Sequence, residues 1–245
     1  MKLSALSEKY RKYKSKIGQT CDLCEKEIFD YPTSRVCKAC KRLLAQDRRK
    51  SCPVCGRKLV SEGVCLTCKK LRPTFERGFS PYAYEDLAAR AVNRMKNGAR
   101  YLAHFFAEEM ERELLCAMGG SFDKENAAIV CVPLTKERQK ERGFNQAEEL
   151  AKALQERLGM PFLSEAVVKR RETPPQKRRT GIERMENIQG AYFVHLRKAC
   201  KGKVLLVVDD IMTTGATGSE MARILYAAGA EKVYFITAVS TPEKK

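Results

Sequence analysis

The stretch VLLVVDDIMTTGAT, residues 204–217, decides the fold of this chain. It opens with five apolar residues, 204–208, which predict a β-strand buried on both faces of a parallel sheet. Two aspartates and a threonine-rich turn follow, and a helix is predicted from Ala216 to Ala228, closed by Gly229. Strand, turn and helix in this order indicate one unit of an α/β sheet, with the turn at the edge where such sheets bind ligands.

The sequence on either side repeats the alternation of strand and helix. Apolar runs at 128–132 and 233–239 predict two further buried strands, and 146–158 predicts a helix closed by Gly159. Between Glu85 and Met118 apolar residues recur every three to four positions, with a break at Asn97-Gly98, which predicts a pair of helices. We therefore expect an α/β fold with a mostly parallel sheet and helices on both of its faces.

The turn after residue 208 carries groups suited to a phosphorylated sugar. Consecutive backbone N–H groups in this turn, where Gly215 stands at the start of a helix, form an anion-binding nest. Three threonine hydroxyls add further donors. Asp209 and Asp210 can accept hydrogen bonds from sugar hydroxyls or bind a divalent cation such as Mg²⁺. The alternative is an ordinary strand-to-helix turn in which Asp210 or Thr214 caps the helix.

Eight of the eleven cysteines form four Cys-x-x-Cys pairs within the first seventy residues. This spacing predicts two structural zinc sites, and residues 21–71 are interpreted as a double zinc ribbon. Sequential pairing keeps each loop short, and a crossed pairing stays open. The predicted ligands are Cys21, Cys24, Cys37, Cys40, Cys52, Cys55, Cys65 and Cys68.

A disulfide framework is the main alternative to zinc, and it requires an oxidising compartment. The first ten residues lack the apolar segment of a signal peptide, and no stretch is long and apolar enough to span a membrane, so we expect a cytoplasmic protein. A redox Cys-x-x-Cys site would occur once and not four times. Cys116, Cys131 and Cys200 are assigned no role.

The 245 residues carry a formal net charge of +17, and two segments hold most of the excess. Residues 1–80 contain twenty Lys and Arg against eight Asp and Glu, and residues 166–203 contain eleven against three. Clustered cations favour a polyanion such as nucleic acid, the alternative being a solvated charge run. We expect a basic arm at 1–20, the ribbons at 21–71, and the α/β domain at 75–245, after a boundary near Pro73.

Residues 207–217 resemble the signature of type I phosphoribosyltransferases, whose substrate is 5-phosphoribosyl-1-pyrophosphate. The resemblance implies that Asp209 and Asp210 hold the ribose hydroxyls and that the turn wraps the 5′-phosphate, with Mg²⁺ accompanying the ligand. The turn residues to which it assigns this role are Thr213, Thr214, Gly215, Ala216 and Thr217.

Further segments resemble the ComF family of competence proteins. These are 84–96, 132–134 with Arg138, 141–147, 172–176 with 183–184, and 187–193, preceded by a double zinc ribbon. The resemblance covers about residues 20–240 and implies a cytoplasmic factor that handles incoming single-stranded DNA during natural transformation. Any motor for DNA translocation would be a separate helicase or translocase, because this chain has no Walker-type loop.

Position within the family implies roles for two basic segments. Arg142-Gly143 resembles the pyrophosphate loop of phosphoribosyltransferases, with Arg138 as a second candidate, and residues 169–190 occupy the place of the flap over the active site. Lys177, Arg178 and Arg179 within that flap either contact nucleic acid or form a solvated run.

Two hypotheses about function remain open from the sequence. One is DNA handling with a regulatory sugar-phosphate pocket, in which aromatic residues stack on bases or only pack; the other is an active Mg²⁺-dependent phosphoribosyltransferase with an unknown acceptor. His104 is expected to be a core residue, and His195 is assigned no role. The aromatic candidates are Tyr10, Tyr13, Phe29 and Tyr31.

Overall fold

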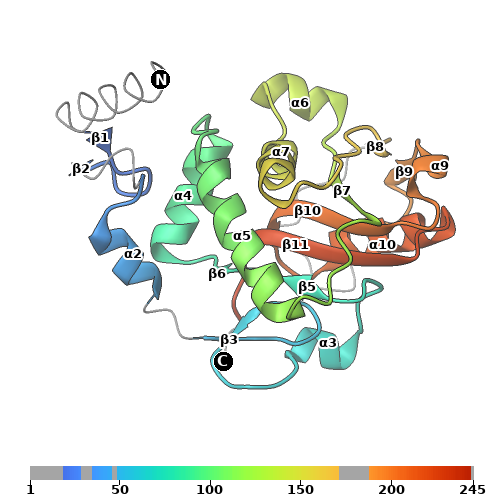
Figure 1. Ribbon diagram of the computed structural model, residues 1–245, viewed down its shortest axis with the longest axis horizontal. Helices are drawn as coiled ribbons and strands as arrows, with labels where there is room; N and C mark the ends of the chain where they lie inside the picture. Colours follow the sequence, from blue (N-terminus) through green and yellow to red (C-terminus); the bar gives the residue numbers. More distant parts are fainter. Residues whose placement is uncertain (1–18, 29–34, 46–48, 171–187, 244–245) are drawn as a thin grey trace, which may run out of the picture.

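A computed structural model of the chain describes residues 19–28, 35–45, 49–170 and 188–243. Its centre is a parallel sheet in the order β5–β11–β10–β7 (Figure 1). The short strand β6 also pairs with β11, further along that strand than β5 does. The expected α/β class is confirmed. The strands are β5 (Gly78–Phe79), β6 (Tyr82–Ala83), β7 (Ala127–Cys131), β10 (Val204–Met212) and β11 (Lys232–Ser240).

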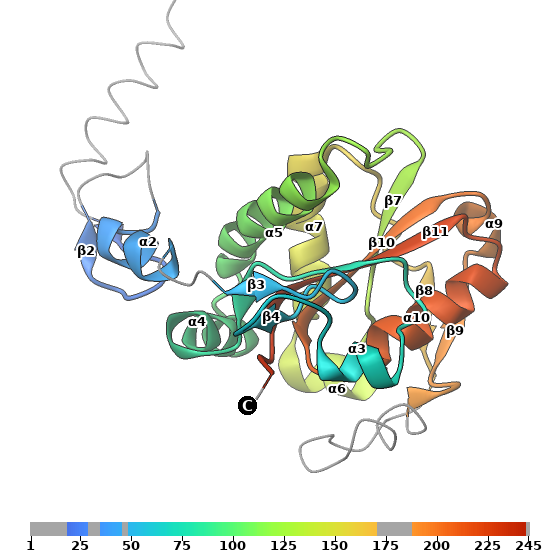
Figure 2. The ribbon, with the colours of Figure 1, turned by 90° about the horizontal axis from the view of Figure 1, so that it is seen from below.

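Helices cover both faces of this sheet, as the sequence predicts. One face carries α4 (Asp86–Lys96), α5 (Leu102–Met118) and α7 (Gln146–Leu158). On the other lie α10 (Ala216–Ala227) and an antiparallel hairpin of β8 (Val167–Lys169) and β9 (Tyr192–Val194) (Figure 2). Two short helices lie in the connections: α6 (Lys136–Arg142) between β7 and α7, and α9 (Arg197–Cys200) between β9 and β10.

The core explains why these residues form these elements. All of Val204 to Val208 is buried, as expected for a strand covered on both faces. The helix over 146–158 is confirmed and ends at Gly159, whose φ of 71° lets the chain leave the helix. Phe106 and Phe235 are among the largest fully buried side chains.

The expectation that His104 is a core residue is wrong. Its side chain is 57% exposed on α5, where Nδ1 lies 3.8 Å from a carboxylate oxygen of Glu156. The apolar stripe of α5 instead uses residues such as Leu102 and Phe106, so His104 belongs to the polar face of the helix.

The two ribbons dock at different places on the domain. The first contains β1 (Gln19–Thr20), β2 (Glu27–Ile28) and α2 (Lys38–Ala45) and lies beside α4, whose Arg94 Nη1 donates to the carbonyl of Asp22 at 2.9 Å. The second contains β3 (Lys50–Ser51), β4 (Lys58–Leu59) and α3 (Leu66–Lys70) and packs against the sheet itself (Figure 2). The domain limits 1–20, 21–71 and 75–245 stay predictions.

Across the part of the chain that the structure describes, no helix combines the length and the apolar character needed to cross a membrane.

Candidate functional site

The acidic pair lies at the carboxyl end of β10. This strand runs to Met212, four residues beyond the expected end at Val208, because β11 continues alongside it and pairs Met212 with Ser240. Successive side chains of a strand point to opposite faces, so Asp209 and Asp210 face different surroundings. The backbone N–H of Asp210 donates to Oδ1 of Asp209 at 2.9 Å.

Asp210 forms an ion pair that the sequence analysis missed. Nζ of Lys96, in the last turn of α4, lies 3.0 Å from Oδ2 of Asp210, and the Asp210 side chain is only 16% exposed. The sequence predicts that the helix ends at Asn97-Gly98, directly after Lys96. It does not predict that this end of the helix lies at the edge of the sheet. The pair places a cation beside the predicted sugar-binding acids.

Asp209 has the most perturbed carboxyl group at this edge. Burial, followed by the charge of Asp210, raises its pKa from the ordinary 3.8 to about 8, and the cations Lys96 and Lys169 oppose this rise only in part. Burial and the charge of Asp209 also raise the pKa of the Tyr192 hydroxyl. A carboxyl group with such a pKa, close to physiological pH, is a feature of functional sites as well as of buried ion-pair networks.

The turn between β10 and α10 places a left-handed glycine directly before the helix. Gly215 has a φ of 81°, a conformation that favours glycine, and α10 begins at the next residue. Oγ1 of Thr214 accepts from the N–H of Ala216 at 3.4 Å. The first N–H groups of α10 therefore gather at the turn, where the helix dipole favours negative charge.

Arg142 and Gly143 close α6 at the same side of the molecule. Gly143, with a φ of 77°, caps the helix, and Nη1 of Arg142 donates to Oε1 of Gln146 at 3.1 Å. Arg142 and Lys96 line one hollow of about 480 Å³. The structure thus brings the predicted pyrophosphate arginine near the lysine that pairs with Asp210, and Arg138 lies one turn earlier in α6.

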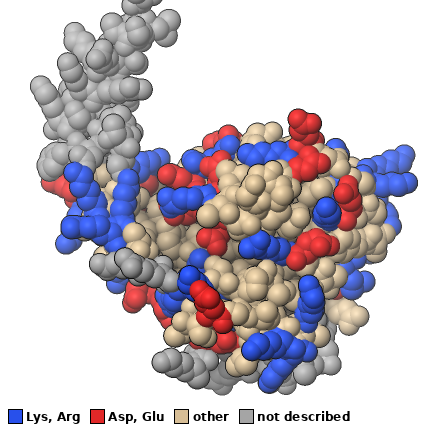
Figure 3. All heavy atoms as spheres, turned by 60° about the horizontal axis from the view of Figure 1, so that its bottom comes forward, with Lys and Arg blue, Asp and Glu red and all other residues tan. Residues whose placement is uncertain are grey.

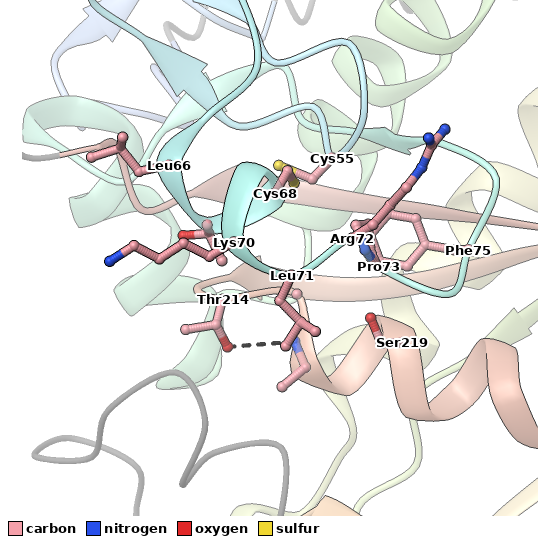
Figure 4. A pocket seen from close by; sticks show the side chains of 13 residues that line it. Cys55, Leu66, Cys68, Lys70, Leu71, Arg72, Pro73, Phe75, Thr214 and Ser219 are labelled. Atoms are coloured by element: carbon pink, nitrogen blue, oxygen red, sulfur yellow. Dashed lines mark hydrogen bonds between the residues drawn. The ribbon is translucent and has the colours of Figure 1, made fainter.

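A second hollow, of about 610 Å³, lies between the second ribbon and the turn (Figure 4). Cys55 and Cys68 line one side of it, and Thr214 and Ser219 line the other. This juxtaposition has no signal in the sequence, because the ribbon and the turn are more than 140 residues apart.

The predicted nucleic-acid residues Lys177, Arg178 and Arg179 lie outside the described residues, as do the aromatic candidates Tyr10, Tyr13, Phe29 and Tyr31.

The eight paired cysteines form two groups in sequential order. Cys21, Cys24, Cys37 and Cys40 make one, and Cys52, Cys55, Cys65 and Cys68 the other, with the sulfur atoms of each group all within 4.8 Å of one another. None of the eight forms a disulfide.

Sulfur geometry in both groups fits a tetrahedral zinc ion. Four ligands about 2.3 Å from a metal are about 3.8 Å apart. The distances are 3.8 Å between Cys24 and Cys37 and 3.7 Å between Cys55 and Cys65. Backbone N–H groups also point at the sulfur atoms, for example that of Cys65 at Sγ of Cys52. The groups are compatible with two zinc sites.

Comparison with known proteins defines the class of this chain. Residues 117–245 match the phosphoribosyl transferase domain family, and the chain belongs to that family. Similar full-length proteins then narrow the assignment. The competence protein ComFC of Bacillus subtilis is 27% identical over 205 residues, covering 81% of this chain and 80% of that protein.

Two further relatives are similar to this chain over comparable shares of both proteins. The DNA utilization protein YhgH of Salmonella typhimurium is 30% identical over 200 residues, covering 81% of this chain and 87% of that protein. Competence protein F of Haemophilus influenzae is 24% identical over 219 residues, covering 87% and 86%. Within its class the chain is a member of the ComF family, as the resemblance in its sequence predicts.

Proposed function

We propose that this protein binds 5-phosphoribosyl-1-pyrophosphate, or a related sugar phosphate, and acts in natural competence by handling incoming single-stranded DNA. The observation that carries the ligand is the end of β10, where two acidic residues are followed, after four intervening residues, by a left-handed glycine and the start of a twelve-residue helix. The names of the ComFC and competence protein F relatives support the competence role, and that of YhgH, a DNA utilization protein, supports the handling of DNA.

Each part of the ligand has a counterpart at this edge. The 5′-phosphate binds the N–H groups of the turn, and the ribose hydroxyls donate to Asp209 and Asp210. Arg142 and Lys96, which line one hollow, bind the pyrophosphate. Lys96 then exchanges Asp210 for phosphate oxygens when the ligand enters.

The carboxylate oxygens of Asp209 and Asp210 are ligands of the type that Mg²⁺ prefers. When bound, Mg²⁺ neutralises charge on the pyrophosphate. The residues of the chain orient the sugar and hold its phosphate end in place.

Replacing both acids tests the ligand assignment. Asp209→Asn with Asp210→Asn is expected to weaken 5-phosphoribosyl-1-pyrophosphate binding at least about tenfold, because hydrogen bonds to charged groups contribute about 1.5–3 kcal/mol each. Isothermal titration in the presence of Mg²⁺ measures the change. The control is Glu108→Gln with Glu165→Gln, which makes the same acid-to-amide change at two exposed positions. Equal affinity of wild type and the Asp209/Asp210 variant would contradict the assignment.

An active phosphoribosyltransferase is the second candidate, and the convergence of Lys96, Arg142 and the acidic pair on one edge supports it. In that case Mg²⁺-dependent release of pyrophosphate from the donor disappears in the Asp209/Asp210 variant while DNA affinity stays unchanged. Donor binding without pyrophosphate release, with a range of nucleobase and DNA acceptors, would favour a regulatory pocket.

A further inference from the structure

We propose that Arg57 is a positioning residue that couples the second zinc site to the turn between β10 and α10, so that zinc in this ribbon sets the affinity of the turn for a sugar phosphate. The coupling rests on the proposed function and adds a means of regulating the same site. It rests on three sets of contacts made by residues 52–57 of the second ribbon, which we call the zinc knuckle: within the knuckle, to the turn after β10, and to β5.

The first contact makes Arg57 part of the zinc knuckle. The N–H of Cys52 donates to the carbonyl of Arg57 at 2.8 Å, and the N–H of Gly56 donates to the carbonyl of Cys52 at the same distance. Gly56 has a φ of 75°, which turns the chain back so that both cysteines face one point. The position of the Arg57 backbone therefore depends on the geometry of the metal site.

The second contact carries the side chain of Arg57 to the turn. Nη2 donates to the carbonyl of Thr213, the residue that follows β10. Arg57 is only 8% exposed, and its Nε is buried without a hydrogen-bond partner among the described residues. A buried guanidinium needs compensating charge, and no carboxylate of the described chain pairs with it. Four thiolates around Zn²⁺ carry a net charge of about −2. One of the four, Cys55, stands two residues before Arg57 in the sequence.

The third contact seats the knuckle on the sheet without space to move. A Cβ atom on Gly56 would lie 2.5 Å from the carbonyl oxygen of Gly78, and one on Gly78 would lie 2.3 Å from that of Cys55. The N–H of Gly78 donates to the carbonyl of Val54 at 2.9 Å, and Gly78 begins β5 of the central sheet. A change in the knuckle is therefore transmitted to the sheet edge.

The two ribbons differ in this respect. The first ribbon contacts the domain through Arg94 of α4, which bonds the carbonyls of Asp22 and Leu23. No hydrogen bond or ion pair joins its described residues to the turn at 213–215. The first zinc site thus provides a control within the same molecule.

The test is Arg57→Gln in the full zinc-loaded chain. We expect two zinc ions to be retained, affinity for 5-phosphoribosyl-1-pyrophosphate with Mg²⁺ to fall about tenfold, within the usual range of coupling between sites, and amide hydrogen exchange over residues 213–216 to become faster. Arg57→Lys, which keeps a charge and a donor, should recover part of both properties. Lys69→Gln removes a charge from an exposed position of the same ribbon and should change neither.

The outcomes separate this proposal from the proposed function. Wild-type affinity together with wild-type exchange at 213–216 in Arg57→Gln overturns the coupling. If wild type itself binds no sugar phosphate, the proposed function fails, and exchange at 213–216 still decides whether Arg57 holds the turn.

A second pair of variants keeps the test decisive if Arg57→Gln loses zinc. Cys68→Ser disturbs the second site and Cys40→Ser the first. The coupling predicts faster exchange at 213–216 only in Cys68→Ser, and equal exchange in the two variants would overturn it.

Discussion

At the residue scale, Asp209 and Asp210 are neighbours in β10 with different surroundings. Asp210 pairs with Lys96 of α4 on one face of the sheet. The charge of Lys169 in β8 lowers the pKa of Asp209, and the charge of Asp209 raises that of Tyr192 in β9, but no ion pair of Asp209 within 4 Å is found in the described chain. The strand thus places two identical side chains in two different environments.

The raised pKa of Asp209 predicts a specific dependence of stability on pH. The folded chain holds this proton more tightly than the unfolded chain, because the pKa is 3.8 ordinarily and about 8 in the fold. Its contribution to the free energy of unfolding is therefore greatest below the lower value and declines as pH rises towards the higher one. Asp209→Asn cannot ionise and should remove this decline. Urea unfolding of zinc-loaded wild type and variant at about pH 6 and about pH 8 measures the difference, and parallel changes in the two proteins would contradict it.

At the element scale, β10 shows how a partner strand extends an element. Aspartate is unfavourable in strands, which is why the sequence predicts an end at Val208. Parallel partners on β11 nevertheless continue to Ser240 and carry the strand through the acidic pair. The turn therefore begins at Thr213, with α10 packed closely behind it.

The packing of α10 on β11 depends on Gly218. A Cβ atom at this position would lie 2.7 Å from the ring of Phe235. We expect Gly218→Ala to lower the free energy of unfolding by about 1–3 kcal/mol, as overpacking does. In a Phe235→Leu background the same change should cost less, and a double-mutant cycle measures this coupling. A cost that is the same in both backgrounds would mean that the ring is not the obstacle.

The sequential cysteine groups predict the metal content of variants. Replacing Cys21, Cys24, Cys37 and Cys40 together by serine should leave one tightly held zinc ion per chain, because the second group is complete. A structural zinc ion contributes on the order of 10 kcal/mol of binding free energy, so its loss is readily detected. Colorimetric zinc release after thiol modification gives the count. Under a crossed pairing this variant would hold no tight zinc.

At the scale of the whole molecule, positive charge is distributed unevenly. On the face drawn in Figure 3, Lys and Arg of the described chain are interspersed with Asp and Glu and do not merge into one continuous field. The segments that hold the largest excess in the sequence, 1–80 and 166–203, extend into residues outside the described ranges. The proposed DNA contact is therefore best tested by salt dependence.

Replacing Lys177, Arg178 and Arg179 by glutamine should flatten the dependence of single-strand affinity on log salt. Each phosphate contact on a single strand contributes about 0.7 to that slope, so the change is up to about 2. The matched control removes three exposed lysines outside both basic segments, namely Lys124, Lys152 and Lys232. A slope unchanged in the first variant would exclude this segment from the contact.

The sequence by itself determined the α/β class, the sheet strands 128–132, 204–208 and 233–239, the main helices and the four Cys-x-x-Cys pairs, because apolar periodicity and Cys-x-x-Cys spacing are local signals. The assignment of these pairs to two sequential groups came from the tertiary structure. Only the tertiary structure decided that Lys96 pairs with Asp210, that β10 runs to Met212, and that Arg57 reaches Thr213 across 156 residues of sequence. Such contacts depend on how distant elements pack side by side at one sheet edge, and no periodicity or spacing within a single segment encodes them.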